Sequence, residues 1–203
     1  MTAGESEAGL APPERAAAVL EFWFGEEPEA GGARPREVWF RRSDEFDAEI
    51  SDRFRSDYEL AAAGELDGWL ETPRGALALA ILLDQFPRNL FRGSARAFET
   101  DARARSVARA ALDRGHDARV SPVERWFFYL PFEHSEDLED QRLSVELFAA
   151  LGEDEESRNV QDYAVRHMEI VERFGRFPHR NAALGREPTP EEEEFLRQPG
   201  SSF

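Results

Sequence analysis

Apolar side chains return every three or four positions along this chain, and that spacing limits the possible folds more than any other feature. Within residues 43–64, the large side chains Phe46, Ile50, Phe54 and Tyr58 recur at intervals of four, which places them on one face of an α-helix. No segment alternates apolar and polar residues as a half-buried strand would, and no Asn-Gly hairpin occurs. The spacing therefore predicts an all-α protein.

The beginnings of several helices are marked by Ser or Thr followed by Pro. Thr72-Pro73, Ser121-Pro122 and Thr189-Pro190 each combine a good N-cap with the residue favoured at the first helical position. A glutamate three residues after Ser121 and after Thr189 completes the pattern of a capping box. Ser43 and Ser135 are further candidate caps.

These signals predict one helical domain. The expected helices cover residues 12–24, 43–64, from 73, 99–114, from 122, 136–151, 159–174 and 190–197. The run at 76–83 is apolar nearly all round, which indicates a central helix covered on several sides. We expect residues 1–11 to be a disordered tail and residues 12–203 to form a single domain of seven to eight helices, with loops at 26–36 and 153–159.

The composition excludes several chemistries. The chain has no cysteine, and all 25 of its basic side chains are arginine. Disulfides, thiolate metal sites, cysteine nucleophiles, Schiff bases and a P-loop lysine are therefore excluded. A GC-rich coding bias or adaptation to high salt would each explain an acidic, lysine-free composition.

The net charge of −17 opposes binding to nucleic acid or an anionic membrane. The N-terminus lacks the basic and apolar regions of a signal peptide, and the apolar run at 76–83 is too short to span a bilayer. We therefore expect a cytoplasmic protein whose partner is neither nucleic acid nor membrane.

Three segments combine proline, aromatic residues and polar groups: 83–92 (LDQFPRNLFR), 131–141 (PFEHSEDLEDQ) and 174–186 (FGRFPHRNAALGR). Proline disfavours the helical region for the residue before it. We therefore predict that helices end, and that the chain turns, at Phe86 and Phe177.

If the three segments meet, their polar side chains would line one pocket able to bind a carboxylate or phosphate group. The candidate ligand-binding residues are Arg88, Asn89, Arg92, Glu133, His134, Asp137, Gln141, His179, Arg180 and Asn181. The alternative is that the arginines pair with the acids and only tie helix ends together. In that case Ser135, Glu136 and Asp137 are simply a favourable helix start.

The histidines are a separate question. His134 lies between Glu133 and Glu136, and flanking carboxylates would raise its pKa and suit proton transfer, or a metal site shared with a second histidine. The alternative for each is a structural, hydrogen-bonded histidine, while His116 is expected to be solvated. The sequence contains no HExxH, no G-x-S-x-G elbow and no G-x-G-x-x-G.

The segments LEFWFG (20–25), LLDQFPRN, LPFEHSED and FGRFPHRNAALGR resemble a bacterial family known only as domain of unknown function 924. The resemblance extends from about residue 17 to 196, and it implies an αα-superhelix of the tetratricopeptide-like class with a concave face. The family has no established activity. Residues that match its pattern are Arg88, Asn89, Arg92, His134, His167, Arg176, His179, Arg180, Asn181 and Arg186, which adds His167, Arg176 and Arg186 to the candidate site.

Three functions remain open at this point. The preferred one is a module that binds a small anionic ligand or an acidic peptide end in a polar pocket. The second is an acid–base or metal-assisted hydrolase using Glu133, His134 and His179. The third is a protein-interaction scaffold with an apolar groove. The sequence identifies no cofactor, metal or oligomeric state.

Overall fold

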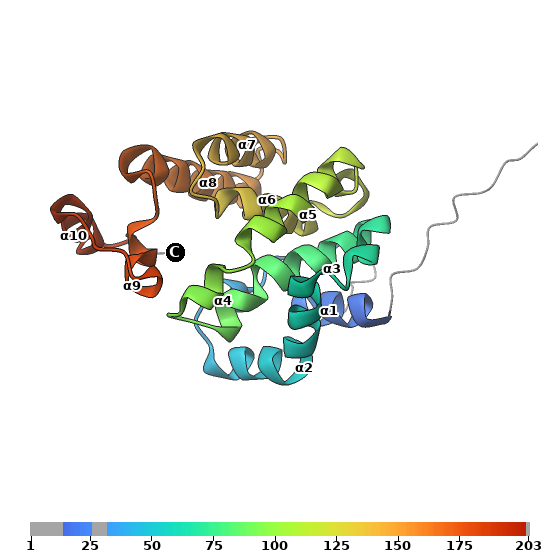
Figure 1. Ribbon diagram of the computed structural model, residues 1–203. Coiled ribbons are helices and arrows are strands. Elements are labelled where there is room, and N and C mark those ends of the chain that lie inside the picture. The colour runs from blue at the N-terminus through green and yellow to red at the C-terminus, as the bar shows by residue number, and fades with distance from the viewer. Residues whose placement is uncertain (1–13, 26–31, 202–203) are drawn as a thin grey trace, which may run out of the picture.

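Helix α3 (Pro73–Asp84) runs through the middle of the protein and is buried from Gly75 to its last residue (Figure 1). Its start follows from the sequence, because the Thr72 hydroxyl accepts a hydrogen bond from the Gly75 N–H at 3.1 Å and Pro73 takes the first helical position. The apolar run therefore forms a central helix, as predicted.

The computed structural model describes residues 14–25 and 32–201, and every regular element in these ranges is helical. The other α-helices are α1 (Glu14–Phe24), α2 (Asp44–Ala63), α4 (Phe86–Leu90), α5 (Asp101–Asp113), α6 (Pro122–Glu133), α7 (Leu138–Ala149), α8 (Glu155–Phe174), α9 (Asn181–Leu184) and α10 (Pro190–Leu196). Short 3₁₀ helices are η1 (Glu37–Trp39), η2 (Asp67–Glu71), η3 (Ala95–Phe98), η4 (Asp117–Arg119) and η5 (Pro178–Arg180). The expected tail at 1–11 lies outside the described residues, as does 26–31 of the expected loop.

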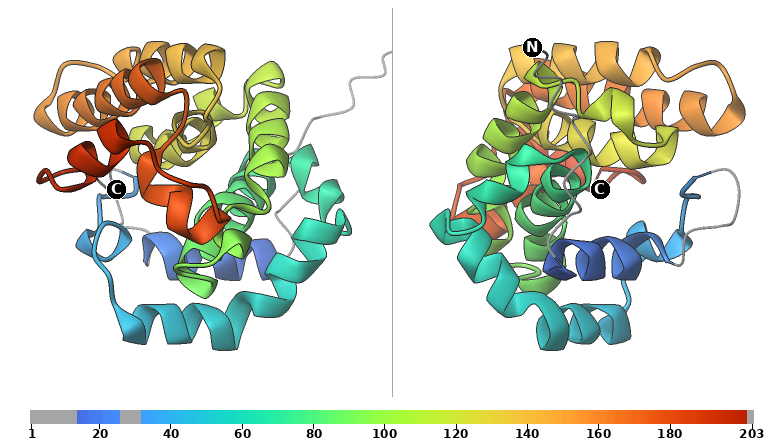
Figure 2. Two further views of the ribbon diagram at one scale, coloured as in Figure 1. Left: turned by 60° about the vertical axis from the view of Figure 1, so that its left-hand side comes forward. Right: turned by 90° about the vertical axis from the view of Figure 1, so that its right-hand side faces the viewer.

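The helices pack in an order that follows the chain. Helix α3 packs against α1, α5 and α6, and α7 lies between α6 and α8. Figures 1 and 2 show α1 and α2 at one end and α7 and α8 at the other, with α3, α5 and α6 between them. The protein is therefore an all-α superhelix, and its last segment, with α9 and α10, lies along one side.

The core is continuous and rich in aromatic side chains. Trp23 stacks on Trp39 at 5.9 Å and meets Phe86 and Phe127, both at 5.6 Å between ring centroids. Such pairs add to the stability gained by burying the rings. None of the described helices is long and apolar enough to cross a membrane.

The predicted helix starts are confirmed at some caps and wrong at others. Ser43 caps α2, and Thr189 with Glu192 forms the expected capping box. The predicted cap at Ser135 is wrong, because Asp137 accepts the N–H bonds that begin α7 at Leu138.

The loop predicted at 153–159 is also wrong in most of its length. Asp154 accepts the N–H of Ser157 at 3.0 Å, so α8 begins at Glu155. The acidic residues Glu155 and Glu156 occupy the first turn of this helix, where its dipole favours negative charge.

One of the two predicted proline turns is confirmed. Phe177 has extended backbone angles (φ −89°, ψ 107°), and the chain turns there shortly after α8 ends at Phe174. Phe86 instead begins α4, directly after Gln85, which is itself helical. Pro87 lies in the first turn of α4, where a backbone N–H would have no helical partner in any case.

The expectation that His116 is solvated is wrong. This residue is 4% exposed, with Nε2 3.0 Å from the Leu70 carbonyl oxygen.

Candidate functional site

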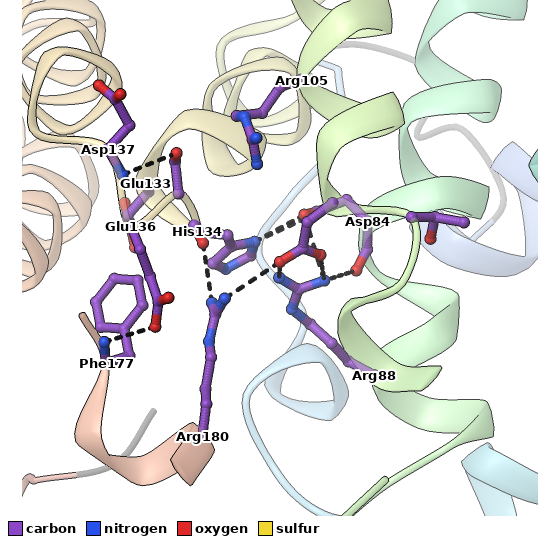
Figure 3. Close-up of polar contacts among 12 residues, drawn as sticks. Asp84, Arg88, Arg105, Glu133, His134, Glu136, Asp137, Phe177 and Arg180 are labelled. Carbon is purple, nitrogen blue, oxygen red and sulfur yellow. Dashed lines mark hydrogen bonds and ion pairs between the residues drawn. The ribbon is translucent and has the colours of Figure 1, made fainter. Parts of the chain in front are cut away.

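The three proline-containing segments meet at the ends of five helical elements. The end of α3, the short α4 and the start of α5 face the end of α6 and η5 (Figure 3). These elements contribute Asp84, Arg88, Asp101, His134 and Arg180, which contact one another. The predicted convergence is therefore observed.

The centre of the site is a carboxylate–imidazole pair. His134 is the C-cap of α6, and its Nδ1–H donates to Asp84, with both carboxylate oxygens at 2.9 Å. Asp84 is buried at the end of the apolar α3, whereas the His134 side chain is 15% exposed. Among the described residues, Nε2 of His134 has no hydrogen-bond partner. The pair thus leaves one imidazole nitrogen available on a ring that solvent reaches.

The pKa of His134 is shifted in the direction opposite to the one expected from the sequence. Burial raises the pKa of Asp84, but Arg88 and His134 outweigh burial and hold that pKa below its usual range. Burial and the guanidinium of Arg88 lower the pKa of His134. The expected rise from flanking carboxylates is wrong, because Glu133 and Glu136 have other partners. At neutral pH an ionised Asp84 faces a neutral imidazole.

Asp101, the first residue of α5, joins two arginines from different segments. Arg88 donates to its two oxygens at 3.0 and 3.3 Å, and Arg180 donates to one of them at 3.2 Å. Arg180 also donates to the His134 carbonyl oxygen at 3.0 Å. Its guanidinium lies 4.6 Å from the ring centroids of both Phe98 and Phe177. Burial, then Arg88, lowers the pKa of Arg180 to about 10, so the group stays charged.

A second acidic residue, Glu133, points away from this pair into the core. Its Oε1 lies 3.2 Å from Nδ1 of His167 in α8. Burial and the nearby Asp84 raise the pKa of Glu133 to about 8. Burial lowers the pKa of His167 to about 3, and its Nδ1–H donates to the Tyr163 carbonyl oxygen at 2.8 Å. Both side chains are therefore neutral at pH 7 and hold α6 and α8 together.

Glu136 attaches the last segment of the chain to the loop between α6 and α7. It accepts the Phe177 N–H at 2.8 Å and a pair of hydrogen bonds from Arg186 at 2.7 and 2.9 Å. Figure 3 shows Glu136 and Phe177 side by side below the α6 end. Burial raises the pKa of Glu136, but Arg186 and the Phe177 N–H outweigh burial, and the pKa is lowered.

Several predicted ligand-binding residues have structural partners elsewhere. Asn89 and Arg92 donate to Asp47 of α2 at 2.7 and 2.9 Å, away from His134. Arg176 donates twice to Glu192 of α10, at 2.6 and 2.8 Å.

The remaining predicted residues mostly join neighbouring turns. Asn181 donates to Glu192 at 3.3 Å and accepts from Arg186 at 2.9 Å. Gln141 is buried and donates to the carbonyl oxygens of Glu133 and Ser135, both at 2.6 Å. Asp137, the N-cap of α7, binds backbone N–H groups of its own helix. For these residues, the alternative in which polar side chains only join helix ends accounts for the contacts observed.

Phe177 contacts the imidazole rings of both His167 and His179. The centroid of Phe177 is 5.6 Å from each imidazole, and His167 in turn is 6.4 Å from His134. Burial and Arg180 lower the pKa of His179 to about 4. Within the described ranges, no group of three or more His, Asp or Glu side chains could hold a metal ion.

The carboxylates that organise the site were not among the residues predicted from the sequence. Asp84 stands inside the motif LLDQFPRN, and a carboxylate at the end of an apolar helix was a signal that could have identified it. Asp101 and Asp140 had no such signal, because each lies in an ordinary polar stretch. Asp140 accepts a hydrogen bond from Ser135, the residue after His134, at 2.9 Å.

Comparison with known proteins supports the fold and leaves the activity open. The model of the family described as "Bacterial protein of unknown function (DUF924)" matches residues 19–200. A solved structure of a protein of unknown function from Agrobacterium tumefaciens is 47% identical, with a TM-score of 0.80 over 90% of this chain and 96% of that one. None of the curated proteins compared with the chain matches it. The chain therefore belongs to the DUF924 family, whose function is unknown.

Proposed function

We propose that the protein is an enzyme in which His134 exchanges a proton with a small substrate. The observation that carries this proposal is the free Nε2 of His134, opposite an Nδ1–H bound by ionised Asp84. A carboxylate in this position fixes the tautomer and stabilises the imidazolium that forms when Nε2 takes a proton. His134 is then a general base that becomes a general acid.

The surroundings of His134 suit this role. Arg88, itself held by Asp101, keeps Asp84 ionised, and it also disfavours a permanent charge on His134. The base form of the imidazole is therefore the resting form at neutral pH. A base positioned in this way contributes about 10²–10⁴-fold to a rate. We assign no direct part to Glu133, because it is buried against His167, and none to His179, whose ring packs on Phe177.

Chemical modification tests the state of His134. Diethyl pyrocarbonate acylates a neutral imidazole nitrogen that carries a free lone pair, and mass spectrometry locates each modified residue. We expect His134 to react at neutral pH, with a rate that rises through a midpoint below 6.5, its ordinary pKa. His116 is the internal control, because its side chain is buried and the reagent does not reach it. A His134 that is no more reactive than His116 would contradict the proposal.

Turnover tests the role itself. Purified full-length protein would be assayed against chromogenic carboxylic and phosphoric esters, alongside His134→Gln and Asp84→Asn. Both variants are expected to lower kcat about 100-fold or more. Arg114→Gln, at the far end of α5, is the matched control and should leave kcat unchanged. Turnover that survives His134→Gln would rule out His134 as the acid–base group.

Ligand binding without chemistry is the second candidate function. One observation favours it: a hollow of about 310 Å³ between η5, α9 and α10, lined in part by His179, Asn181 and Arg186. This size suits a small molecule. Arg186 and Asn181 already bond each other there, which limits the groups left for a ligand. Saturable binding to this hollow with no effect of His134→Gln would favour this candidate.

The cytoplasmic location and the small-molecule partner belong to the same proposal. The net charge of −17 supports a partner that is neither nucleic acid nor an anionic membrane. A protein-interaction scaffold has less support. In the described part of the chain, the large exposed apolar side chains are Phe40, Leu60, Tyr163 and Leu196, and they belong to four separate parts of the fold.

A further inference from the structure

Two arginines on α5 share the carboxylate of Asp140, which is bonded to Ser135, the residue after His134. The Nε of Arg105 lies 3.2 Å from Asp140 Oδ2, and Arg109 donates to Asp140 Oδ1 at 2.9 Å. Asp140 also accepts a hydrogen bond from the Ser135 hydroxyl, so one carboxylate serves three donors. The two guanidinium groups therefore carry one positive charge more than their partner cancels.

This excess is local and unusual in so acidic a chain. Arg88 and Arg180 form ion pairs with Asp84 and Asp101, so the charges of these two arginines are balanced by two aspartates. Within the described residues, Arg105 and Arg109 form ion pairs only with Asp140. Four arginines thus face three aspartates in a protein with a net charge of −17.

The arginine pair is linked to the His134 segment through Asp140 and Ser135. Arg105 is one turn after Asp101 on α5, and Ser135, bound to the same Asp140, directly follows His134. In Figure 3, Arg105 extends from α5 toward the space beside His134 and Glu133. The side chain of Arg105 is 29% exposed and that of Arg109 is 55% exposed, whereas Arg180 is only 7% exposed. Solvent, and therefore a ligand, reaches this arginine pair.

We infer that Arg105 and Arg109 bind the oxyanion group, a phosphate or a carboxylate, of the molecule on which His134 acts. This inference rests on the proposed function for the role of His134, but the anion site stands on its own contacts. Planar guanidinium groups form paired hydrogen bonds with such oxyanions. Arg88 and Arg180, which the sequence favoured for this task, are already bonded to Asp101.

The test uses the full chain with inorganic phosphate and acetate as separate probes, while NMR follows the imidazole resonances of His134. Saturable shifts with either ion support the inference and identify the group, and the absence of saturation with both overturns it. Arg105→Gln and Arg109→Gln should each weaken binding about tenfold or more. Arg114→Gln, an arginine beyond the end of the same helix that pairs with Glu71, should bind as the wild type does.

A variant that is expected to tighten binding distinguishes loss of the site from loss of folding. Asp140→Asn removes the carboxylate that competes for both guanidiniums, so it should tighten oxyanion binding several-fold. Unchanged or weaker binding by a folded Asp140→Asn protein would contradict the inference. Asp84→Asn separates the two proposals, because it disturbs the orientation of His134 and leaves the arginine pair intact. If the Asp84→Asn protein still binds the oxyanion but has lost turnover, the anion site is supported whether or not His134 is the acid–base group.

Discussion

Nδ1 of His167 lies 3.2 Å from Oε1 of Glu133, so an imidazole and a carboxyl group share a site that water barely reaches. The folded protein holds a proton on Glu133 up to a pH of about 8, whereas the unfolded chain releases it near the ordinary value of 4.5. The stability contributed by the protonated Glu133 is therefore complete at low pH and is lost as pH rises toward 8.

Glu133→Gln should remove this pH dependence. Relative to the variant, the free energy of unfolding of the wild type should fall by up to about 1.4 kcal/mol per pH unit between the two pKa values. Urea unfolding at several pH values measures it, with the exposed Glu139→Gln as control. Parallel pH profiles for wild type and Glu133→Gln would mean that Glu133 is ionised in the folded protein.

Asp101→Asn should be strongly destabilising. The change leaves the guanidiniums of Arg88 and Arg180 without the carboxylate that both contact. Breaking a buried charge pair by removing one partner costs about 3–5 kcal/mol. Asp113→Asn, at the exposed end of the same helix, should stay within about 0.5 kcal/mol of the wild type. Chemical denaturation distinguishes the two, and equal effects would show that the Asp101 contacts add little.

Glu136→Gln should loosen the last segment and leave the central core intact. The variant loses the ionic bonds to Arg186 and weakens the bond from the Phe177 N–H. Hydrogen exchange of residues 175–201 should become faster, while α3 keeps its protection. Glu146→Gln on α7 is the control. Unchanged exchange of this segment would assign its attachment to Arg180 and the apolar contacts instead.

Gly75→Ala should lower the melting temperature, although alanine is normally the better residue in a helix. A Cβ at this position would lie 2.3 Å from the Trp69 carbonyl oxygen and 2.7 Å from the Thr72 hydroxyl. Relieving such overlap typically costs about 1–3 kcal/mol. Gly68→Ala in η2 is the matched control, because nothing lies within 4 Å of its added Cβ. Thermal unfolding of both variants is the measurement, and a stabilised Gly75→Ala protein would contradict the expected overlap.

Helix starts were predicted best where an N-cap residue directly precedes a run of regularly spaced apolar residues. Thr72 before the apolar run gave the start of α3 correctly. At the start of α7, Ser135 and Asp137 are both good caps two residues apart, and only the tertiary position of the chain selects Asp137. The loop interpretation of 153–159 failed because it treated a run of acids as a solvated loop, when the same charges favour a helix N-terminus.

The candidate site was predictable in place but not in pairing. The motifs indicated that Arg88, His134 and Arg180 would meet, and they do. Which carboxylate each arginine binds depends on contacts between segments distant in sequence, and local pattern carries no information about those distances. The role of Asp101 follows only from the packing of α5 against α6 and η5.

Arg180 binds a carboxylate that lies 79 positions earlier in the chain. A ribosome releases the polypeptide from its N-terminus, so Asp84, Asp101 and His134 emerge well before this arginine. The contacts of Arg180 with Asp101 and with the His134 carbonyl oxygen can therefore form only after residue 180 has been synthesised. During synthesis, the last partner of this cluster arrives well after the groups that it joins.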